Sequence, residues 1–468
     1  MEGLLEVGDS NYNFRLIRDP DIIKAYSQDA LGIKGNFQGV VRPKGEEEIL
    51  EVISYCHKTS TKLTPQGLRT SLTGASMADE GIALCLEGMN RIIDLDENAK
   101  VAYVEPGVPT GELSILCSSL GLMYPPDPTS QKECTIGGNV ATNASGSRSL
   151  KFGPTGNWVF YLRVIDGTGK IHELYTKKGL KSACGPSMFQ NGLDLFVGSE
   201  GIFGIITKIG LKLIEAPPDS IIFVVFFEDI YKALEFVTHV ILHKRKLPTS
   251  MELLDEYCMH LLEGKEGYYA PKDSRCIIYF EEDLWEDLNE DEILESWYGL
   301  IEKHTRFFED TILLKSHKQK EVFKKLRHSV PEALNEQSIK ATKQGGLKIS
   351  TDWVVPIENI IKIFQYFDEV RPMLKDMPVA RYGHIGSGHP HFNIIARDHQ
   401  EKELAKEVEK RLILKALELG GTVSGEHGIG KLKKAYLGLM YPEATTNILK
   451  SVKNMMDPKW ILSPGNII

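Results

Sequence analysis

The chain has 468 residues, of which 42% are hydrophobic and 25% charged, and its formal net charge is −9 at pH 7. Its length predicts two or three domains, and its composition is that of an ordinary soluble protein. The negative charge argues against nucleic acid as a partner, because a phosphate backbone requires a basic surface. The seven scattered cysteines form no CxxC pair, which argues against iron–sulfur clusters and thiolate zinc sites and favours a reducing compartment.

The ends and apolar runs of the chain predict its location. The N-terminus is acidic where a signal peptide would be basic. The longest apolar run, Ile221–Phe227, is too short to cross a bilayer. We therefore expect a cytoplasmic protein, or one that binds a membrane peripherally.

The first half alternates helices and short strands. Residues 45–58 are predicted to form a helix, with acidic residues in the first turn and basic residues at the end. Short β-type runs follow at Ile82–Leu86, Val101–Val104, Leu162–Ile165 and Ile205–Leu213. This pattern predicts an α+β domain that ends near the proline-containing segment at residues 216–219.

The second half opens with an apolar strand at Ile221–Phe227 and a helix at about Tyr231–Lys244. The acidic and amphipathic stretch Glu282–Glu309 is expected to form a solvated helix. Further expected elements are strands at Cys276–Glu281 and Lys348–Val355 and a helix at about Gln400–Leu419, which Gly420 and Gly421 end.

Three glycine-rich segments stand out in the first half, at residues 65–75, at 125–129 with 135–146, and at 198–206. The first offers backbone N–H groups and hydroxyls without carboxylates, which is the chemistry that a pyrophosphate requires. A lone glycine-rich loop is usually only a turn. The three together, in this order, are a specific signal for a flavin nucleotide site.

Two segments near the end, Gly383–Asn393 and Ser424–Gly430, place four imidazoles and a carboxylate among glycines. The glycines and Pro390 exclude a helix in the first segment, so we expect a strand, a turn and a strand that fold His384 and His391 towards one point. Imidazole and carboxylate ligands suit zinc, manganese or iron. A spare histidine beside a ligating glutamate would be placed to act as a base.

Together these segments resemble the vanillyl-alcohol-oxidase-type flavoproteins with a PCMH-type FAD domain. The similarity is strongest to the branch of D-lactate dehydrogenases, glycolate oxidase flavin subunits and D-2-hydroxyglutarate dehydrogenases, and it covers roughly residues 35–468. It implies an α+β fold with an FAD-binding domain of two subdomains at residues 1–218. An antiparallel-sheet cap domain with flanking helices would follow at 219–425, and a C-terminal helical segment at 426–468 would close the active site. No GxGxxG follows a strand, so a Rossmann fold is not expected.

The resemblance implies FAD as cofactor, with its pyrophosphate on the loop Gly67–Gly74. The implied FAD-binding residues are Gly67, Leu68, Arg69, Thr70, Ser71, Gly74, Pro126, Asp127, Thr129, Gly138, Thr142, Ser145, Gly201, Ile206 and Asn466. Arg69 either pairs with a phosphate or points to solvent. The loop has no histidine or cysteine that would tether the flavin, so noncovalent FAD is expected. Asn466 stands where the family usually has lysine, which removes a cation near the flavin.

The resemblance assigns His384, His391 and Glu426 as ligands of a divalent metal, with zinc preferred over manganese and iron. It assigns His427 as the catalytic base. His389 is an additional ligand, a substrate contact or a spectator.

Cationic and polar side chains for an anionic substrate are also implied. Arg327 matches the arginine that grips a carboxylate in the family, and a guanidinium suits that role because it binds both oxygens; the alternative is a solvated basic helix face. Lys348 is expected to present a second basic group. Asn393 has the strand parity of His391 and would hydrogen-bond the substrate. Lys431 and Lys433 are expected at the surface.

We expect FAD-dependent, metal-assisted oxidation of a small anionic 2-hydroxy acid of the D series, such as D-lactate, glycolate or D-2-hydroxyglutarate, to the 2-oxo acid. The chain has no cluster motif and no nicotinamide fingerprint. Electrons are therefore expected to pass to a separate acceptor, namely a quinone, a cytochrome, an iron–sulfur subunit or an electron-transfer flavoprotein. The alternatives are a noncatalytic flavin subunit that relays electrons in a multi-subunit complex, an oxidase that forms peroxide, and a lyase-like use of the flavin as in alkyl-transfer relatives. The oligomeric state stays open, with a homodimer among the options.

Overall fold

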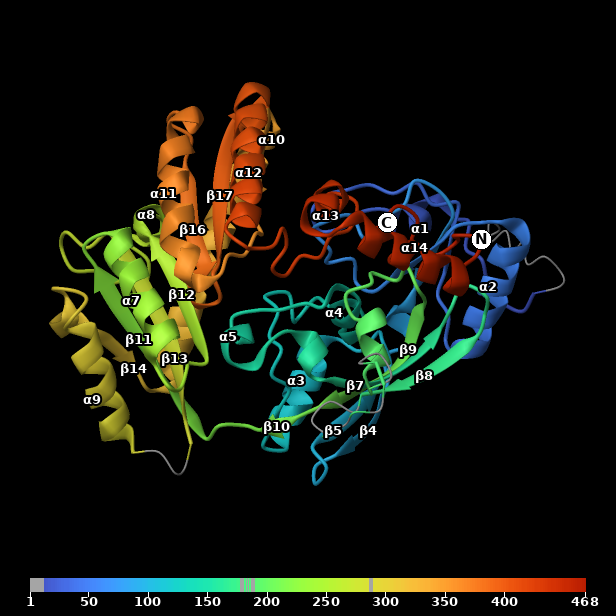
Figure 1. Ribbon diagram of the computed structural model, residues 1–468, viewed down its shortest axis with the longest axis horizontal. Helices are drawn as coiled ribbons and strands as arrows, with labels where there is room; N and C mark the ends of the chain where they lie inside the picture. Colours follow the sequence, from blue (N-terminus) through green and yellow to red (C-terminus); the bar gives the residue numbers. More distant parts are fainter. Residues whose placement is uncertain (1–11, 177–180, 182, 184, 187–189, 286–288) are drawn as a thin grey trace. The chain divides into compact units, whose positions relative to one another are not determined.

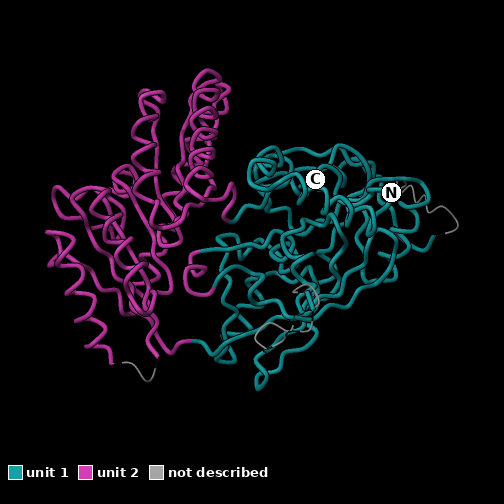
Figure 2. The backbone as a smooth tube through the Cα atoms, viewed as in Figure 1, with its two compact units in different colours: residues 1–146, 153–216, 426–468 teal, residues 147–152, 217–425 magenta. Residues whose placement is uncertain are grey.

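The computed structural model describes the chain except for residues 1–11, 177–180, 182, 184, 187–189 and 286–288. The described chain divides into two compact units, shown as ribbons in Figure 1 and coloured separately in Figure 2. Unit 1 comprises residues 1–146, 153–216 and 426–468, and unit 2 comprises residues 147–152 and 217–425. The C-terminal segment is therefore part of the first unit.

Unit 1 is built on two main sheets. Within its described residues, a parallel three-stranded sheet has the order β1-β3-β2, and an antiparallel five-stranded sheet has the order β4-β5-β9-β7-β8. The strands are Gly39–Val41 (β1), Leu63–Gln66 (β2), Ile82–Cys85 (β3), Ile92–Asp96 (β4), Val101–Val104 (β5), Leu122–Met123 (β6), Val159–Ile165 (β7), Ile171–Tyr175 (β8), Ile205–Lys212 (β9) and Ile214–Glu215 (β10). This combination of helices with parallel and antiparallel sheets confirms the predicted α+β fold class.

The helices of unit 1 include the first one predicted from the sequence. They are Pro20–Ala25 (α1), Glu46–Thr59 (α2), Thr110–Ser119 (α3), Ile136–Thr142 (α4), Lys434–Met440 (α13) and Glu443–Met456 (α14). In α2, Ile49, Val52, Ile53 and Cys56 recur at helical spacing and are buried, and three glutamates occupy the first turn. The helix ends at Ser60, which has a left-handed backbone conformation.

The C-terminal segment completes unit 1 through a buried ion pair. Lys453 and Asp457 are both buried, and their Nζ and Oδ2 atoms are 2.5 Å apart. The Lys453 ammonium also donates to the carbonyls of Ile202 and Leu462, at 2.6 and 3.0 Å. These bonds compensate the buried charge and hold the last residues against the glycine-rich segment at residues 198–206.

Unit 2 is built on an antiparallel sheet which, within the described residues, has the order β14-β11-β13-β12-β16-β17-β15. Its strands are Asp219–Phe227 (β11), Ser250–Asp255 (β12), Cys276–Leu284 (β13), Ile312–Leu314 (β14), Gly345–Ser350 (β15), Val379–His384 (β16) and His389–Asp398 (β17). Its helices are Ser149–Phe152 (α5), Ile230–His243 (α7), Glu256–Leu262 (α8), Glu290–Ile301 (α9), His317–Thr342 (α10), Ile360–Val370 (α11) and His399–Glu418 (α12). This confirms the predicted antiparallel cap with flanking helices.

Helices cover both faces of this sheet. Strands and helices α8 and α10 share one apolar core on the first face, which we call the α10 face; its members include Val224, Phe226, Leu254, Ile277, Ala380 and Ile395 of the strands and Cys258, Met259, Leu262, Leu326, Val330 and Leu334 of the helices. On the opposite face, Phe236 of α7 packs on Phe227, and Phe364 of α11 packs on Phe392. Side chains alternate along each strand, and residues paired across neighbouring strands share a face. The α10 face therefore also carries five side chains of the site, Glu252, Tyr279, His384, His391 and Asn393.

Two predicted elements of unit 2 need correction. The expected solvated helix at 282–309 starts too early, because Glu282 and its neighbours continue strand β13. Helix α9 follows, and it buries Trp297, whose indole N–H donates to Glu282 at 3.1 Å. The expected strand at 348–355 ends at Ser350, beyond which the backbone N–H of Val355 bonds to Gly388 in the hairpin turn.

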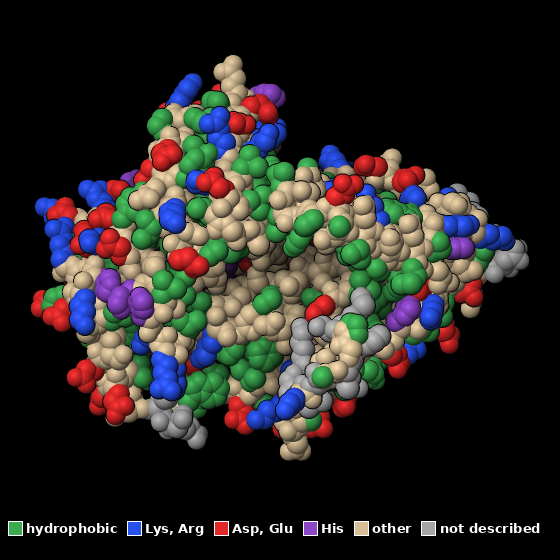
Figure 3. Space-filling model, viewed as in Figure 1, with side chains coloured by type: hydrophobic (Ala, Val, Ile, Leu, Met, Phe, Trp, Pro, Cys, Tyr) green, Lys and Arg blue, Asp and Glu red, His purple; other side chains and the backbone are tan. Residues whose placement is uncertain are grey.

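The surface of the protein carries charges of both signs. In the view of Figure 3, acidic and basic side chains are interspersed on both units. No helix in the described ranges is long and apolar enough to cross a membrane.

Candidate active site

A hairpin of β16 and β17 positions three histidines; the sequence predicted this strand, turn and strand for His384 and His391. His384 ends β16 and pairs with His389, the first residue of β17, across a short turn at residues 385–387. Gly383 has a φ of +109°, and a Cβ there would lie 2.8 Å from Cδ2 of His391. Gly388 has a φ of +66°, and a Cβ there would lie 2.0 Å from the Val355 carbonyl oxygen. Only glycine fits these two positions, so they fix the approach of the histidine rings.

The three imidazoles are buried and close together. Their ring centroids are 4.6 Å apart for His389 and His391, and 5.6 to 5.7 Å apart for the pairs with His384. His391 Nδ1 lies 3.1 Å from the carbonyl oxygen of Thr351, and His384 Nδ1 lies 2.7 Å from Oε1 of Glu252. Because a carbonyl only accepts, His391 carries its proton on Nδ1 and its ligand lone pair on Nε2. Such an acceptor behind each ring is typical of metal-binding histidines.

His389 has a different partner, Asp352. Its Nε2 lies 3.0 Å from Oδ1 of Asp352, and the other carboxylate oxygen accepts from the Ser424 hydroxyl at 2.6 Å. The N–H of Gly425 donates to the Asp352 carbonyl at 2.8 Å, and a Cβ at Gly425 would lie 2.5 Å from the His389 ring. These contacts tie the end of unit 2 to the histidine hairpin.

Donors on this hairpin and beside it could hold a metal ion. Asp352, His389 and His391 offer ligand atoms that lie within 4.8 Å of one another, and all three are buried. Two imidazoles and a carboxylate are a donor set suited to zinc, manganese or iron. These three donors and the ligand set implied by the resemblance have His391 in common. The implied set contains His384 where the structure brings together His389 and Asp352. The predicted Glu426 and His427 follow Gly425 directly and begin the last segment of unit 1.

Arg327 lies on α10 and faces the sheet rather than solvent. Its Nε donates to the Tyr279 hydroxyl at 2.7 Å, and its Nη2 lies 3.4 Å from Oε2 of Glu252. Among the described residues its Nη1 has no hydrogen-bond partner. The charge effect of Tyr279 is the largest influence on the pKa of Arg327 and raises it. Burial lowers this pKa, but Glu252 also raises it, so that it lies above its ordinary value. The guanidinium therefore stays charged in a half-buried setting, which suits it to an anionic ligand.

The other two predicted substrate residues lie on neighbouring strands. Lys348 of β15 donates to the Asn335 side chain, and burial lowers its pKa. Asn393 of β17 is buried, and its amide donates weakly to the backbone carbonyl of His391 at 3.4 Å. The residues that sequence reasoning missed are Glu252, Tyr279 and Asp352, which hold the predicted side chains in place.

The predicted pyrophosphate loop follows strand β2 in unit 1. A Cβ at Gly67 would lie 2.5 Å from Oγ1 of Thr135, so this position requires glycine. The Arg69 guanidinium stacks 4.6 Å from the ring centroid of Tyr26, and its Nη1 donates to the Gly67 carbonyl at 3.3 Å. Arg69 is thus packed against the protein, not extended into solvent.

The loop has the chemistry of a nucleotide site. Ser71 Oγ accepts from the backbone N–H groups of Thr73 and Ala75, both at 3.3 Å. At the ends of the loop, the buried atoms Gln66 Oε1 and Ser76 Oγ have no hydrogen-bond partner among the described residues. A bound ligand would satisfy such atoms. The remaining predicted FAD residues also lie in unit 1: Leu68, Thr70, Gly74, Pro126, Asp127, Thr129, Gly138, Thr142, Ser145, Gly201, Ile206 and Asn466.

Lys431 is half-buried against this loop, which corrects its predicted surface position. Its Nζ donates to Oδ1 of Asn466 at 2.6 Å and to the carbonyl of Gly74 at 3.3 Å. Asn466 in turn donates to the Ala75 carbonyl at 2.8 Å. A lysine from a different segment thus places a cation beside Asn466, where the sequence predicted the loss of one.

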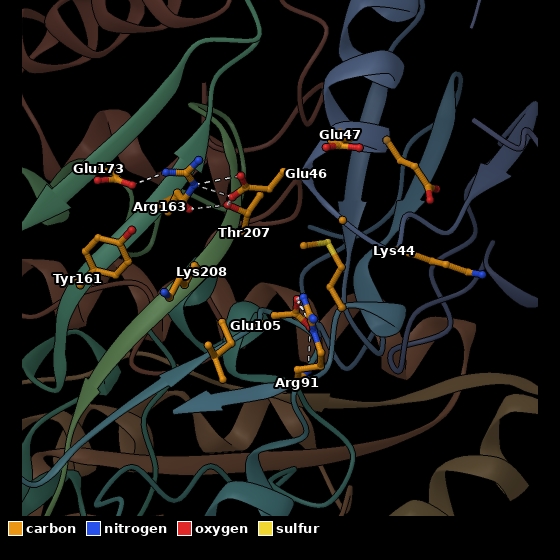
Figure 4. A pocket seen from close by; sticks show the side chains of 14 residues that line it. Lys44, Glu46, Glu47, Arg91, Glu105, Tyr161, Arg163, Glu173, Thr207 and Lys208 are labelled. Atoms are coloured by element: carbon orange, nitrogen blue, oxygen red, sulfur yellow. Dashed lines mark hydrogen bonds and ion pairs between the residues drawn. The ribbon is translucent and has the colours of Figure 1, made fainter. Parts of the chain in front are cut away.

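A pocket of about 650 Å³ in unit 1 lies elsewhere, at the start of α2 and against β7 and β9 (Figure 4). Arg163 Nε pairs with Glu46 at 2.8 Å, and Arg91 pairs with Glu105 at 2.7 Å. No residue predicted for the site lines this pocket. Both of its arginines are paired with carboxylates, so neither is free to bind an anionic substrate.

Comparison with known proteins agrees with both units. The chain matches the FAD binding domain family over residues 37–175 and the C-terminal domain of FAD linked oxidases over residues 216–467. The chain therefore belongs to the FAD-linked oxidase family, which confirms the resemblance, and FAD is the cofactor that its first unit binds.

Curated relatives match over nearly the whole chain. The glycolate oxidase subunit GlcD of Bacillus subtilis is 30% identical and covers 92% of this chain and 88% of its own. A D-lactate dehydrogenase of Anaerostipes hadrus is 30% identical, covering 97% and 94%. A D-2-hydroxyglutarate dehydrogenase of Stutzerimonas stutzeri is 27% identical, covering 97% and 96%. The 4-ethylphenol oxidase of Gulosibacter chungangensis shares the fold, with a TM-score of 0.70 at 15% identity over 98% of this chain and 94% of its own.

Proposed function

We propose that this FAD-linked oxidase is a dehydrogenase that converts a small 2-hydroxy acid of the D series to the 2-oxo acid at the histidine hairpin of unit 2. The observation that carries the proposal is the α10 face. One sheet surface there holds three buried imidazoles and, at Glu252, a carboxylate shared by His384 and Arg327. Glycolate, D-lactate and D-2-hydroxyglutarate, which the names of the relatives contain, are the substrates to test.

Arg327 binds the substrate carboxylate in this proposal. Tyr279 and Glu252 occupy its Nε and Nη2 edges, so the plane of the guanidinium is fixed before a substrate arrives. An anion then meets Nη1 at little cost in side-chain entropy. Lys348 supplies a second cation, and Asn393 hydrogen-bonds the substrate.

His384, His391 and Glu426 hold a divalent metal, with zinc preferred, and His389 with Asp352 forms the alternative ligand pair. When bound, the metal lowers the pKa of the substrate hydroxyl. His427 removes the hydroxyl proton. FAD would supply the hydride acceptor for the α-carbon, so that the substrate would lose one proton and one hydride in total.

The electrons then leave to a separate acceptor, which we propose is a quinone, a cytochrome, an iron–sulfur subunit or an electron-transfer flavoprotein. FAD is held noncovalently, because the loop Gly67–Gly74 contains neither histidine nor cysteine. The protein therefore retains FAD only through noncovalent contacts with this loop and with the charged groups around the loop.

Separating the ligand from the base tests this assignment. Glu426→Ala should lower metal content and activity together. His427→Ala should retain metal and FAD but lose about 10²–10⁴-fold in rate, and its pH–rate profile should lose the acidic limb, because an imidazole must be neutral to accept a proton. His260→Ala, an exposed position on α8, is the control. The measurements are elemental analysis and turnover of each variant. Loss of the metal from the His427 variant but not from the Glu426 variant would reverse the two roles. Wild-type protein without a divalent metal would refute the metal-assisted scheme.

A further inference from the structure

Lys431 is joined to the glycine-rich loop by both its backbone and its side chain. The backbone N–H groups of Lys431 and Leu432 donate to the Thr73 carbonyl at 3.0 and 3.3 Å. The ammonium donates to the carbonyl of Gly74, the next residue of the loop, and to Asn466. All of these residues belong to unit 1. The ammonium is therefore fixed at the C-terminal end of the loop.

This ammonium lacks a counter-ion among the described residues. Glu200 has the strongest charge effect of the acidic groups around Lys431. Its carboxylate, however, accepts from the backbone N–H groups of Ile429 and Gly430, at 2.6 and 2.9 Å, and within the described part of the chain it forms no ion pair with Lys431. A half-buried cation that is hydrogen-bonded only to neutral oxygens is costly, and a bound anion would remove that cost. Arg69 is packed on Tyr26, whereas Lys431 donates to the carbonyl of Gly74 at this end of the loop.

We propose that Lys431 is a phosphate-binding residue of this chain, whose ammonium neutralises the pyrophosphate of FAD on the loop Gly67–Gly74. The inference rests on the FAD site described above. It assigns to Lys431 the cation that Asn466 does not supply, and it gives Asn466 the task of orienting the ammonium through its side-chain carbonyl.

The titration of Lys431 gives the inference a signature. Burial lowers the pKa of this lysine to about 8, against the opposing effect of Glu200 and, more weakly, of Asp79 and Asp29, while Lys434 lowers it further. A bound pyrophosphate would raise this pKa again. Binding therefore takes up a proton between about pH 8 and the higher pKa of the complex, and affinity should fall as the pH rises through that window.

The test is ligand binding by the full-length protein freed of its flavin. ADP carries the pyrophosphate without the flavin ring, and riboflavin carries the ring without any phosphate. Lys431→Met should weaken ADP and FAD by about 10- to 100-fold at pH 7, the scale of a charge-assisted hydrogen bond, and leave riboflavin unchanged. Lys431→Arg should recover most of the affinity. Lys450→Met removes the same charge from an exposed position of α14 and should change none of the affinities.

The pH series decides between a phosphate contact and a structural role. Wild-type affinity for ADP should fall by up to tenfold per pH unit above about pH 8, and that of Lys431→Met should stay flat. Equal losses for riboflavin and ADP, an unchanged ADP affinity, or a fall in the melting temperature of the flavin-free variant would each overturn the inference. Wild-type protein that binds neither FAD nor ADP would instead refute the FAD site itself.

Discussion

Glu252 joins two residues of the site that the sequence predicted separately. Its side chain is buried, with one oxygen 2.7 Å from Nδ1 of His384 and the other 3.4 Å from Nη2 of Arg327. A buried carboxylate is stable only when such partners compensate its charge. Glu252 therefore sets the orientation of the proposed metal ligand and of the proposed substrate clamp together.

Glu252→Ala should consequently affect metal binding and substrate binding at once. Loss of the acceptor behind a ligating histidine typically lowers metal affinity by about 10–100-fold. We expect a loss of that size, with a raised KM because Arg327 loses one of its anchors, and with unchanged FAD content. Metal titration and steady-state kinetics measure the two effects. Glu281→Ala removes a carboxylate of the same sheet that bonds to Ser220 and is the matched control; equal effects in both variants would show a general disturbance of the sheet.

Sequence reasoning predicted side chains whose positions depend on local patterns. Glycines, a proline and strand alternation were sufficient for the hairpin and for the shared face of His391 and Asn393. Glu252 and Asp352 were missed because their partners lie far along the chain, 132 residues away for His384 and 37 for His389. The pairing register of distant strands, which brings them together, is not encoded in local periodicity. Lys431 was missed for the same reason, since its loop and Asn466 come from opposite ends of the sequence.

At the scale of secondary-structure elements, one carboxylate fixes the start of α2 to the five-stranded sheet of unit 1. Glu46, in the first turn, accepts from Arg163 of β7 and from the hydroxyl of Thr207 of β9. Burial acts to raise the pKa of Glu46, but the hydrogen bonds from Arg163 and Thr207 outweigh it and hold this pKa below its ordinary value. A negative charge in the first turn also interacts favourably with the helix dipole.

Glu46→Gln should therefore destabilise the protein in a pH-dependent way. Because the folded-state pKa is depressed, the contribution is complete above the unfolded value of 4.5 and is lost as the pH falls through the folded value. We expect a loss of about 1 kcal/mol at pH 7 that shrinks below pH 4.5. Urea unfolding across this range measures it. Glu47→Gln, on the exposed side of the same turn, should have no such effect, and a difference that persists at low pH would exclude a charge effect.

Element prediction failed where tertiary contacts override local composition. The acidic stretch after residue 281 was expected to be a helix, yet it continues β13 as far as Leu284. Asp283 there pairs with Lys151 at 2.7 Å, and Glu282 accepts from Trp297 of α9. These partners come from distant segments. They stabilise the acidic end of a strand that the local sequence alone would disfavour.

At the scale of the whole molecule, the chain builds unit 1 from separate segments and places unit 2 between them. It returns to unit 1 between Gly425 and Glu426. Gly425 lies against His389 of the hairpin, and the proposed base His427 is only two positions further along the sequence.

The most direct test of the central claim is anaerobic reduction of the flavin by substrate. Purified wild-type protein should lose its flavin absorbance on addition of glycolate, D-lactate or D-2-hydroxyglutarate, and L-lactate should leave it unchanged. The bleaching by the accepted acid should slow by about 10²–10⁴-fold in His427→Ala at unchanged FAD content. Flavin that stays oxidised with every one of these acids, or that is bleached equally by L-lactate, would contradict the account.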